Sequence, residues 1–163
     1  MEAFNVNYVI VGGGGAQLHG AQRPTMDIDV VPDWTTANLE RMCDLLRPRH
    51  RRVRHRTAGN SAQITPELLV DREITNWHTT VGHIDVMVGI PDADGGPVVF
   101  DELFERGVRM QLGRTWVVVA DLADIVVSKE HANRAKDRQA LPELYRLLET
   151  QRQPPPPSLG LER

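Results

Sequence analysis

A run of four glycines, Gly12 to Gly15, constrains the fold of this 163-residue chain more than any other feature. The hydrophobic segment Tyr8 to Val11 precedes the run, and a second one, Met26 to Val31, follows after a short link. Glycine adopts positive φ angles and lets a ligand approach the backbone closely. We therefore expect a strand, a glycine turn, a short helix over residues 16–20 and a second strand. The turn is either a phosphate-binding loop or only a tight connection.

Two aspartates, Asp27 and Asp29, interrupt the second hydrophobic segment. Because successive side chains of a strand point to opposite faces, both carboxylates share one face, and Ile28 and Val30 share the other. Carboxylates about 7 Å apart repel each other, so such a pair is kept where a cation lies between them or one holds a proton. Hard oxygen ligands suit Mg²⁺ or Mn²⁺, with substrate phosphates completing the coordination. The alternative, two solvated residues on an edge strand, conflicts with the rarity of Asp in strands.

Composition and simple motifs exclude several other classes of protein. A net charge of −3 excludes a chain that is basic overall, and the single Cys43 excludes an internal disulfide or a multi-cysteine metal site. The glycine run lacks the Gly-Lys-Ser/Thr of a P-loop and the spacing of a dinucleotide-binding fingerprint. No apolar run approaches the ~20 residues of a transmembrane helix, and the first residues do not resemble a signal peptide. We therefore expect a cytoplasmic protein that does not contact a membrane.

The glycine run, followed twelve residues later by Asp27-Ile28-Asp29, resembles the signature of the nucleotidyltransferase superfamily related to DNA polymerase beta. The segment Arg23 to Asp29 resembles in particular the stand-alone bacterial group that includes the AbiEii-type and MenT-type toxins. The resemblance implies an α/β (α+β) nucleotidyltransferase fold, in which a small mixed β-sheet is flanked by helices and followed by a C-terminal helical pair. It implies an enzyme that moves a nucleoside monophosphate from an NTP to an acceptor hydroxyl and releases pyrophosphate.

A third aspartate, Asp85, fits the same resemblance. Residues 76–81 and 83–88 flank Gly82 and predict two strands joined at a turn or bulge. Asp85 falls on the face opposite Ile84 and Val86, so it is either an isolated edge residue or a site residue. By resemblance, Asp85 completes the metal ligands with the first two aspartates and favours deprotonation of the acceptor hydroxyl.

The C-terminal region supplies the candidate cations. Asp121 predicts the start of a helix, and Lys129 falls on the apolar stripe of that helix. A lysine there either extends its ammonium group to water or points at nucleotide phosphate. The run from Lys129 to Asp137 resembles the Lys, Arg and Lys-Asp run of the superfamily, before a last helix that we expect over residues 141–150 with Pro142 in its first turn.

The resemblance also assigns nucleotide-binding residues. It implies that Lys129 holds the triphosphate, and that Asp137 orients Lys or Arg groups or the nucleotide, although Asp137 could equally cap the last helix. Arg134 is either a phosphate contact or part of a structural ion pair. The other implied nucleotide-binding residues are Gly13, Gly14, Gly15 and Thr25. Many relatives have Gly-Ser where this chain has Gly14-Gly15, so backbone amides replace a side-chain contact.

A basic stretch over residues 47–56 contrasts with the acidic remainder, and it contains six arginines. It is either a solvated loop or a surface for phosphate backbones. In the second case a tRNA would bind through Arg49, Arg51, Arg52, Arg54 and Arg56. Toxin-type relatives imply a tRNA 3′ end as acceptor and an antitoxin protein as partner.

Other acceptors and one other class of function stay open at this point. A protein hydroxyl or an aminoglycoside-like small molecule could replace RNA as the acceptor. A non-catalytic module that binds a nucleotide or a partner is the alternative to an enzyme. We expect a single nucleotidyltransferase domain over residues 1–150 and a disordered Pro-rich tail over residues 151–163.

Overall fold

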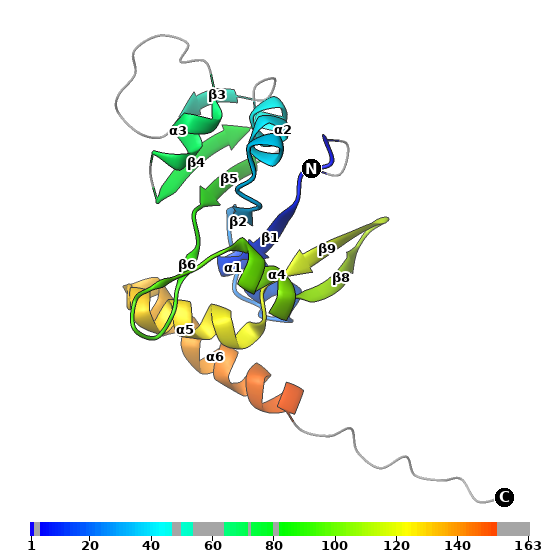
Figure 1. Ribbon diagram of the computed structural model, residues 1–163. Coiled ribbons are helices and arrows are strands. Elements are labelled where there is room, and N and C mark those ends of the chain that lie inside the picture. Colours follow the sequence, from blue (N-terminus) through cyan, green and yellow to red (C-terminus); the bar gives the residue numbers. More distant parts are fainter. Residues whose placement is uncertain (2–3, 47–49, 54–63, 72, 80–81, 153–163) are drawn as a thin grey trace, which may run out of the picture.

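The computed structural model describes residues 1, 4–46, 50–53, 64–71, 73–79 and 82–152. The strands are β1 (Tyr8–Val11), β2 (Asp27–Pro32), β3 (His50–Val53), β4 (Ile74–Thr79), β5 (Gly82–Met87), β6 (Ile90–Pro91), β7 (Pro97–Val98), β8 (Val108–Leu112) and β9 (Thr115–Val119). The helices are α1 (Gly12–Leu18), α2 (Thr36–Leu46), α3 (Pro66–Val70), α4 (Phe100–Arg106), α5 (Leu122–Ala132) and α6 (Ala135–Arg152) (Figure 1).

One mixed sheet has the strand order β3-β4-β5-β2-β1-β9-β8, and β6 pairs separately with β7. Strand β2 lies antiparallel to β1 and parallel to β5, and β1 lies parallel to β9. The remaining neighbours in the sheet are antiparallel. This arrangement confirms the predicted mixed sheet with flanking helices and a C-terminal helical pair.

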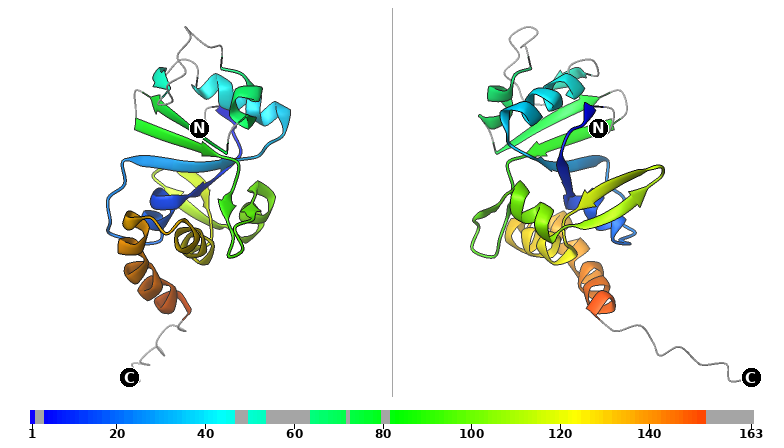
Figure 2. Two further views of the ribbon diagram at one scale, coloured as in Figure 1. Left: turned by 90° about the vertical axis from the view of Figure 1, so that its left-hand side faces the viewer. Right: turned by 45° about the vertical axis from the view of Figure 1, so that its right-hand side comes forward.

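Hydrophobic residues pack on both faces of the sheet, and two neighbours on β2 show how the faces divide. Val31 belongs to a core cluster with α5 and α6 residues such as Leu122. Val30 belongs to a second cluster with α2 residues such as Met42. The two aspartates of β2 precede Val31 at even spacing, so they lie on the face that α5 and α6 cover. The views in Figures 1 and 2 show α2 and the α5–α6 pair on opposite sides of β2.

The glycine run forms a helix, which corrects the prediction of a turn followed by a helix over residues 16–20. Helix α1 begins at Gly12, whose φ is +62°. A Cβ on Gly15 would lie 2.9 Å from Ile125 Cδ1 and 3.3 Å from the Ile10 carbonyl oxygen. Close packing between β1 and α5 therefore favours glycine, although glycine in a helix costs about 1 kcal/mol relative to alanine. Helix propensity considered alone could not anticipate this contact.

Several other predicted elements are confirmed. The predicted pair of strands around Gly82 corresponds to β4 and β5. Helix α5 begins where the sequence indicates, because the Asp121 carboxylate accepts a hydrogen bond from the Ala123 amide at 2.7 Å. Asn133, in the left-handed conformation, ends α5.

The last helix begins earlier than predicted. Helix α6 starts at Ala135, and Pro142 therefore lies inside the helix and outside its first turn. The first turn is polar and has no apolar periodicity, so a pattern of hydrophobic residues could not detect it. The helix continues through Gln151 and Arg152, two residues beyond the predicted domain boundary. The rest of the predicted tail lies outside the described residues.

The basic stretch is described only in part. Strand β3 covers His50 to Val53 at one edge of the sheet, and Arg49, Arg54 and Arg56 lie outside the described residues. Within the described part of the chain, no helix is both long enough and apolar enough to cross a membrane.

Candidate active site

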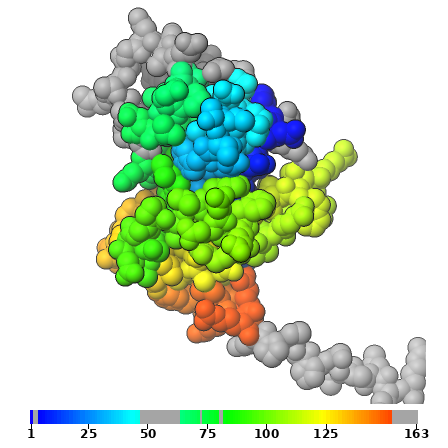
Figure 3. All heavy atoms as spheres, viewed as in Figure 1, coloured from blue at the N-terminus to red at the C-terminus, as the bar shows by residue number. Residues whose placement is uncertain are grey.

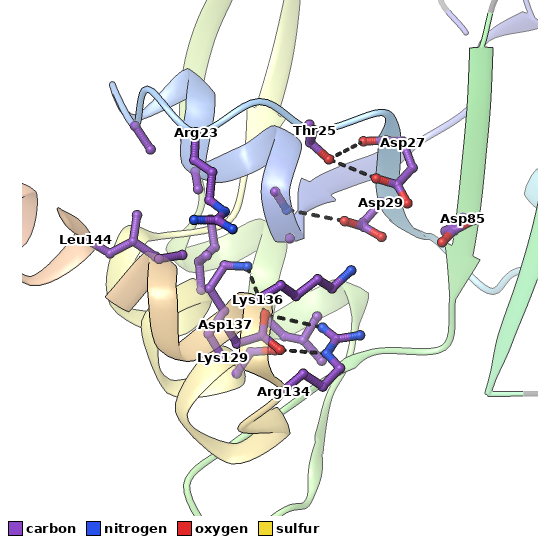
Figure 4. Close-up of a pocket in the computed structure, with 18 of the residues that line it drawn as sticks. Arg23, Thr25, Asp27, Asp29, Asp85, Lys129, Arg134, Lys136, Asp137 and Leu144 are labelled. Atoms are coloured by element: carbon purple, nitrogen blue, oxygen red, sulfur yellow. Dashed lines mark hydrogen bonds and ion pairs between the residues drawn. The ribbon is translucent and has the colours of Figure 1, made fainter. Parts of the chain in front are cut away.

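Three aspartates meet on the face of the sheet that α5 and α6 cover. Strands β2 and β5 are parallel neighbours, and their register places Asp29 beside Asp85 and Asp27 beside His83. Residues that are paired in this way point to the same face of a sheet. The structure therefore brings together the three predicted metal ligands, which lie 58 residues apart from first to last in the sequence. Figure 4 shows their carboxylates on one side of a shared pocket.

Asp29 has the least favourable electrostatic environment of the three. Burial raises its pKa, and the nearby charges of Asp85 and Asp27 raise it further. The Gly13 amide, which donates to Asp29 Oδ2 at 3.3 Å, and the charge of Lys136 act in the opposite direction. The net result is a pKa of about 6, raised from 3.8. Ionised Asp29 therefore lacks sufficient positive charge around it.

The backbone around the aspartates leaves no room for larger residues. Gly12 has a positive φ, and a Cβ there would lie 2.0 Å from Asp29 Oδ2. A Cβ on Gly13 would lie 2.9 Å from Thr25 Oγ1. The same Thr25 hydroxyl donates a hydrogen bond to Asp27 Oδ1 at 2.8 Å. Thr25, predicted as a nucleotide-binding residue, thus contacts a carboxylate directly and fixes its orientation.

The predicted glycines do not share one surface, because Gly13 and Gly14 line different pockets and Gly15 is buried. Gly13 lines the pocket beside the aspartates together with Gly12, which the sequence reasoning missed. Gly14 and Gly15 do not line it, so the predicted contact of these two residues with nucleotide finds no support in their position. The signal that could have found Gly12 is its place directly after a strand, where the helix N-terminus starts.

Opposite the aspartates, α5 and α6 contribute a cluster of charged residues. The side chain of Asp137 is fully buried, and it accepts hydrogen bonds from Arg134 Nε at 2.6 Å and from Lys129 Nζ at 3.3 Å. Burial alone would raise the pKa of Asp137, but the hydrogen bond and charge of Arg134, together with Lys129, lower it below its usual value. The carboxylate of Asp137 therefore orients the two cations, as one of the two predictions for this residue stated.

The positions of the two cations bear on the earlier alternatives for Lys129 and leave both alternatives for Arg134 open. The Lys129 side chain is only 14% exposed, and its ammonium group pairs with Asp137, so it does not extend into water. The Arg134 side chain pairs with the same carboxylate but is 60% exposed. Both residues line the pocket that the aspartates line.

Two further cations line the pocket and were not among the predicted site residues. Lys136 extends toward the aspartates in Figure 4, and its charge lowers the pKa of Asp29. The Arg23 guanidinium donates a hydrogen bond to Gln139 Oε1 at 2.7 Å. Both residues lie in segments that the sequence analysis singled out: Lys136 directly precedes Asp137, and Arg23 begins the segment that resembles the toxin group. The sequence does not indicate, however, which lysine or arginine side chains of these segments reach the pocket.

The pocket between the two walls has a volume of about 340 Å³. Acidic side chains from β2 and β5 form one wall, and basic side chains from α5, α6 and the segment before β2 form the other. Polyphosphate anions fit the basic wall, and a hard divalent cation fits the acidic wall because carboxylate oxygens are its preferred ligands. The arrangement can therefore hold a metal–nucleotide complex between the walls.

The carboxylates are not yet arranged as the ligands of a metal ion. Within the described residues, no three His, Cys, Asp or Glu side chains are placed so that they could hold a metal ion. The donor set itself is suitable, and the raised pKa of Asp29 is the change that a nearby cation would reverse. A metal ion would therefore bind with some rearrangement of the carboxylates, together with the phosphates of its nucleotide.

The fold resembles those of solved nucleotidyltransferases. Lincosamide antibiotic adenylyltransferase LnuA, with lincomycin bound, aligns with a TM-score of 0.58 and 13% identity over 90% of each chain. A Thermotoga maritima protein provisionally assigned as a nucleotidyltransferase aligns with a TM-score of 0.46 and 14% identity, over 90% of this chain and 79% of its own. No protein-family model and no curated protein sequence matches the chain.

The alignment with LnuA shows that the chain has the nucleotidyltransferase fold, which confirms the predicted fold class. The narrower resemblance to AbiEii-type and MenT-type toxins stays a prediction.

Proposed function

We propose that the protein is a metal-dependent nucleotidyltransferase, which moves a nucleoside monophosphate from an NTP to an acceptor hydroxyl. The observation that supports this most strongly is the placement of Asp27, Asp29 and Asp85 on one face of adjacent strands, across a pocket from Lys129 and Arg134. The nucleotidyltransferase fold makes the same assignment more plausible but does not establish an activity by itself.

The two walls have separate roles in this proposal. The basic wall binds the β- and γ-phosphates through Lys129, with Arg134, Lys136 and Arg23 available beside it. The three aspartates would hold Mg²⁺ or Mn²⁺. When bound, such a metal would neutralise charge on the attacking and leaving oxygens.

The reaction exchanges one phosphoanhydride bond of the NTP for one phosphoester bond to the acceptor. The acceptor oxygen attacks the α-phosphorus and forms a new P–O bond, while the bond from the α-phosphorus to the bridging oxygen breaks. Pyrophosphate leaves with that electron pair, and the hydroxyl proton passes to the carboxylate of Asp85. The Thr25 hydroxyl donates a hydrogen bond to Asp27 Oδ1 at 2.8 Å and so restricts the orientation of this carboxylate.

A tRNA 3′ end is the acceptor that the sequence favours, with a toxin role and an antitoxin partner. One structural observation is consistent with RNA. Arg52 pairs in register with His78, which pairs with His83, which in turn pairs with Asp27. The backbone of Arg52 is therefore aligned across the sheet with that of Asp27. A small-molecule acceptor is the competing proposal, since LnuA acts on a lincosamide antibiotic.

Label transfer from each of the four α-³²P NTPs tests the proposal. Total tRNA and the protein itself serve as acceptors, with Mg²⁺ or Mn²⁺, and Asp27→Ala/Asp29→Ala serves as the inactive control. Transfer to RNA that the double variant loses would support a tRNA-modifying enzyme, and labelling of protein alone would indicate protein nucleotidylation. Intact binding of Mg-NTP without transfer to any acceptor class, small molecules included, would contradict the enzyme and support a non-catalytic module.

A further inference from the structure

A second pocket, of about 410 Å³, adjoins the candidate active site. The two pockets share Thr25 and Asp27. Ile28 and Ile84 line the second pocket from the face of the sheet opposite the aspartates, while Asp27 and His83 line it from the aspartate face. The second pocket therefore reaches around the starts of β2 and β5 to a proposed metal ligand.

The lining of this second pocket is mainly apolar. Aliphatic side chains come from five elements of the chain: Ile10, Leu18, Ile28, Ile84 and Leu112. Leu112 lies in β8, and the β8–β9 hairpin projects from the body of the molecule in Figure 3. Of the described residues that line the pocket, none is Arg or Lys.

Three apolar side chains at this pocket are unusually exposed. Met26, between Thr25 and Asp27, is 85% exposed, and Ile28 and Leu112 are 47% and 48% exposed. Clustered exposed apolar groups at a concave surface are typical of a binding site. Met is flexible and adapts to ligands of different shape. These side chains thus form an apolar surface at the entrance to the catalytic aspartates.

We infer that this pocket binds the apolar body of a small hydroxyl-bearing molecule, which is the acceptor of the proposed transfer. The inference rests on the proposed function and specifies its acceptor. The pocket is continuous with Asp27, so a hydroxyl on the bound molecule can lie at the shared edge while its apolar part contacts Ile28 and Ile84. The acceptor oxygen then becomes a phosphoester, pyrophosphate leaves, and the proton passes to a site carboxylate.

A polynucleotide is the less suitable occupant of this pocket. Affinity for nucleic acid comes chiefly from Lys and Arg contacts with phosphates. The described lining offers none of these, and Asp27 at its edge would repel a phosphate backbone. The volume is within the ~300–1,000 Å³ range of small-molecule pockets.

Isoleucine methyl groups can report on the two pockets separately. Ile10, Ile28 and Ile84 line the second pocket, whereas Ile74, Ile90 and Ile125 line the first. Ile64 lines neither and serves as the reference. The protein labelled with ¹³C at isoleucine methyl groups is titrated with MgATP and then with n-octyl β-D-glucoside below its micelle concentration. Glucose, the same sugar without an apolar chain, is the control probe.

We expect MgATP to shift the three methyl signals of the first pocket, and octyl glucoside, but not glucose, to shift those of the second. Absence of these shifts with MgATP and with the other three Mg-NTPs would contradict the proposed function, whatever octyl glucoside does. Shifts with MgATP, but none with octyl glucoside at Ile10, Ile28 and Ile84, would overturn the further inference alone.

A pocket-filling variant, Ile28→Trp, tests whether the bound molecule is the acceptor. The matched control is Val70→Trp, which changes another exposed aliphatic residue, on α3, 52% exposed and outside both pockets. We expect Ile28→Trp to raise the KM for octyl glucoside as nucleotide acceptor by about tenfold, measured by mass spectrometry of the nucleotidylated sugar, and to leave the MgATP shifts unchanged. An unchanged KM, or labelling of tRNA that is equally efficient in Ile28→Trp and wild type, would overturn the inference.

Discussion

Asp29, which is partly buried, and Asp137, which is fully buried, lie on opposite walls of one pocket, and their carboxyl pKa values shift in opposite directions. Burial and two neighbouring aspartates raise the pKa of Asp29 to about 6. Burial also acts on Asp137, but Arg134 and Lys129 overcome it and lower the pKa. Nearby cations thus neutralise the carboxylate of the basic wall, whereas the carboxylates of the acidic wall are only partly neutralised. Such an imbalance is costly for stability and is therefore expected where a ligand supplies the missing charge.

The largest expected effect is on catalysis by the acidic wall. Asp29→Asn keeps the shape of the side chain but removes a ligand charge, so we expect nucleotide transfer to fall on the order of 10³-fold, or about 4 kcal/mol. Single-turnover transfer from α-labelled NTP measures it. Asp101→Asn, an exposed residue of α4, is the control and should retain wild-type activity. Equal activity of Asp29→Asn and wild type would contradict a catalytic role for Asp29.

The same substitution on the basic wall should reduce stability. Asp137→Asn removes the partner of a largely buried Lys129, and we expect it to lower the free energy of unfolding by about 3 kcal/mol at pH 7. Arg134→Gln should cost less than about 1 kcal/mol, because the Arg134 side chain is 60% exposed. Urea denaturation measures both. The Asp137 contribution is present above the unfolded pKa and is lost as the pH falls through the lowered folded pKa. A deficit that persists undiminished in acid would contradict the ion-pair explanation.

The pH dependence of Asp29 should have the opposite sign. Its folded pKa is raised from 3.8 to about 6, so its favourable contribution is present below 3.8 and is lost as the pH rises through 6. We expect Asp29→Asn to be more stable than wild type by about 3 kcal/mol above pH 7, with the difference vanishing near pH 4. Adding Mg²⁺ should reduce the difference at high pH, and EDTA should restore it. Urea midpoints that show no pH-dependent difference would contradict the raised pKa.

The smallest expected effect compares two glycines of α1. Gly12→Ala should cost about 1–2 kcal/mol of stability because of its positive φ, and it should also weaken nucleotide transfer by displacing Asp29. Gly14→Ala should be neutral or slightly stabilising, since a Cβ there meets only Ile10 Cγ2 at 3.8 Å. Thermal unfolding together with transfer rates separates the two effects. Similar behaviour of the two variants would contradict the distinct positions assigned to Gly12 and Gly14.

The sequence predicted the acidic wall well, because the alternation of strand side chains is a local property. The alternation of side chains along a strand was enough to place Asp27 and Asp29 on the same face of one strand. The same alternation placed Asp85 opposite its neighbours Ile84 and Val86. Their meeting on adjacent strands followed from the family resemblance, and the register of β2 and β5 now shows it.

The basic wall and the glycine helix depended on long-range contacts, which no local pattern contains. The first turn of α6 is held by the contacts of Asp137 with Lys129 and Arg134, and its sequence has no apolar period. Position 15 favours glycine because a Cβ there would lie 2.9 Å from Ile125 Cδ1 in α5 and 3.3 Å from the Ile10 carbonyl oxygen in β1. Which glycine approaches Asp29 could be decided only from the positions of both in space.

The order of the walls along the chain has a consequence for synthesis on the ribosome. All three aspartates precede residue 86, whereas Lys129, Arg134 and Asp137 come more than 40 residues later. At about 5–20 residues per second, several seconds separate the emergence of the two groups. Strand β1 must also wait for β9, its parallel partner. A nascent chain therefore exposes repelling carboxylates without their counter-charges, and the pocket proposed to bind nucleotide is complete only once the final helical pair has docked.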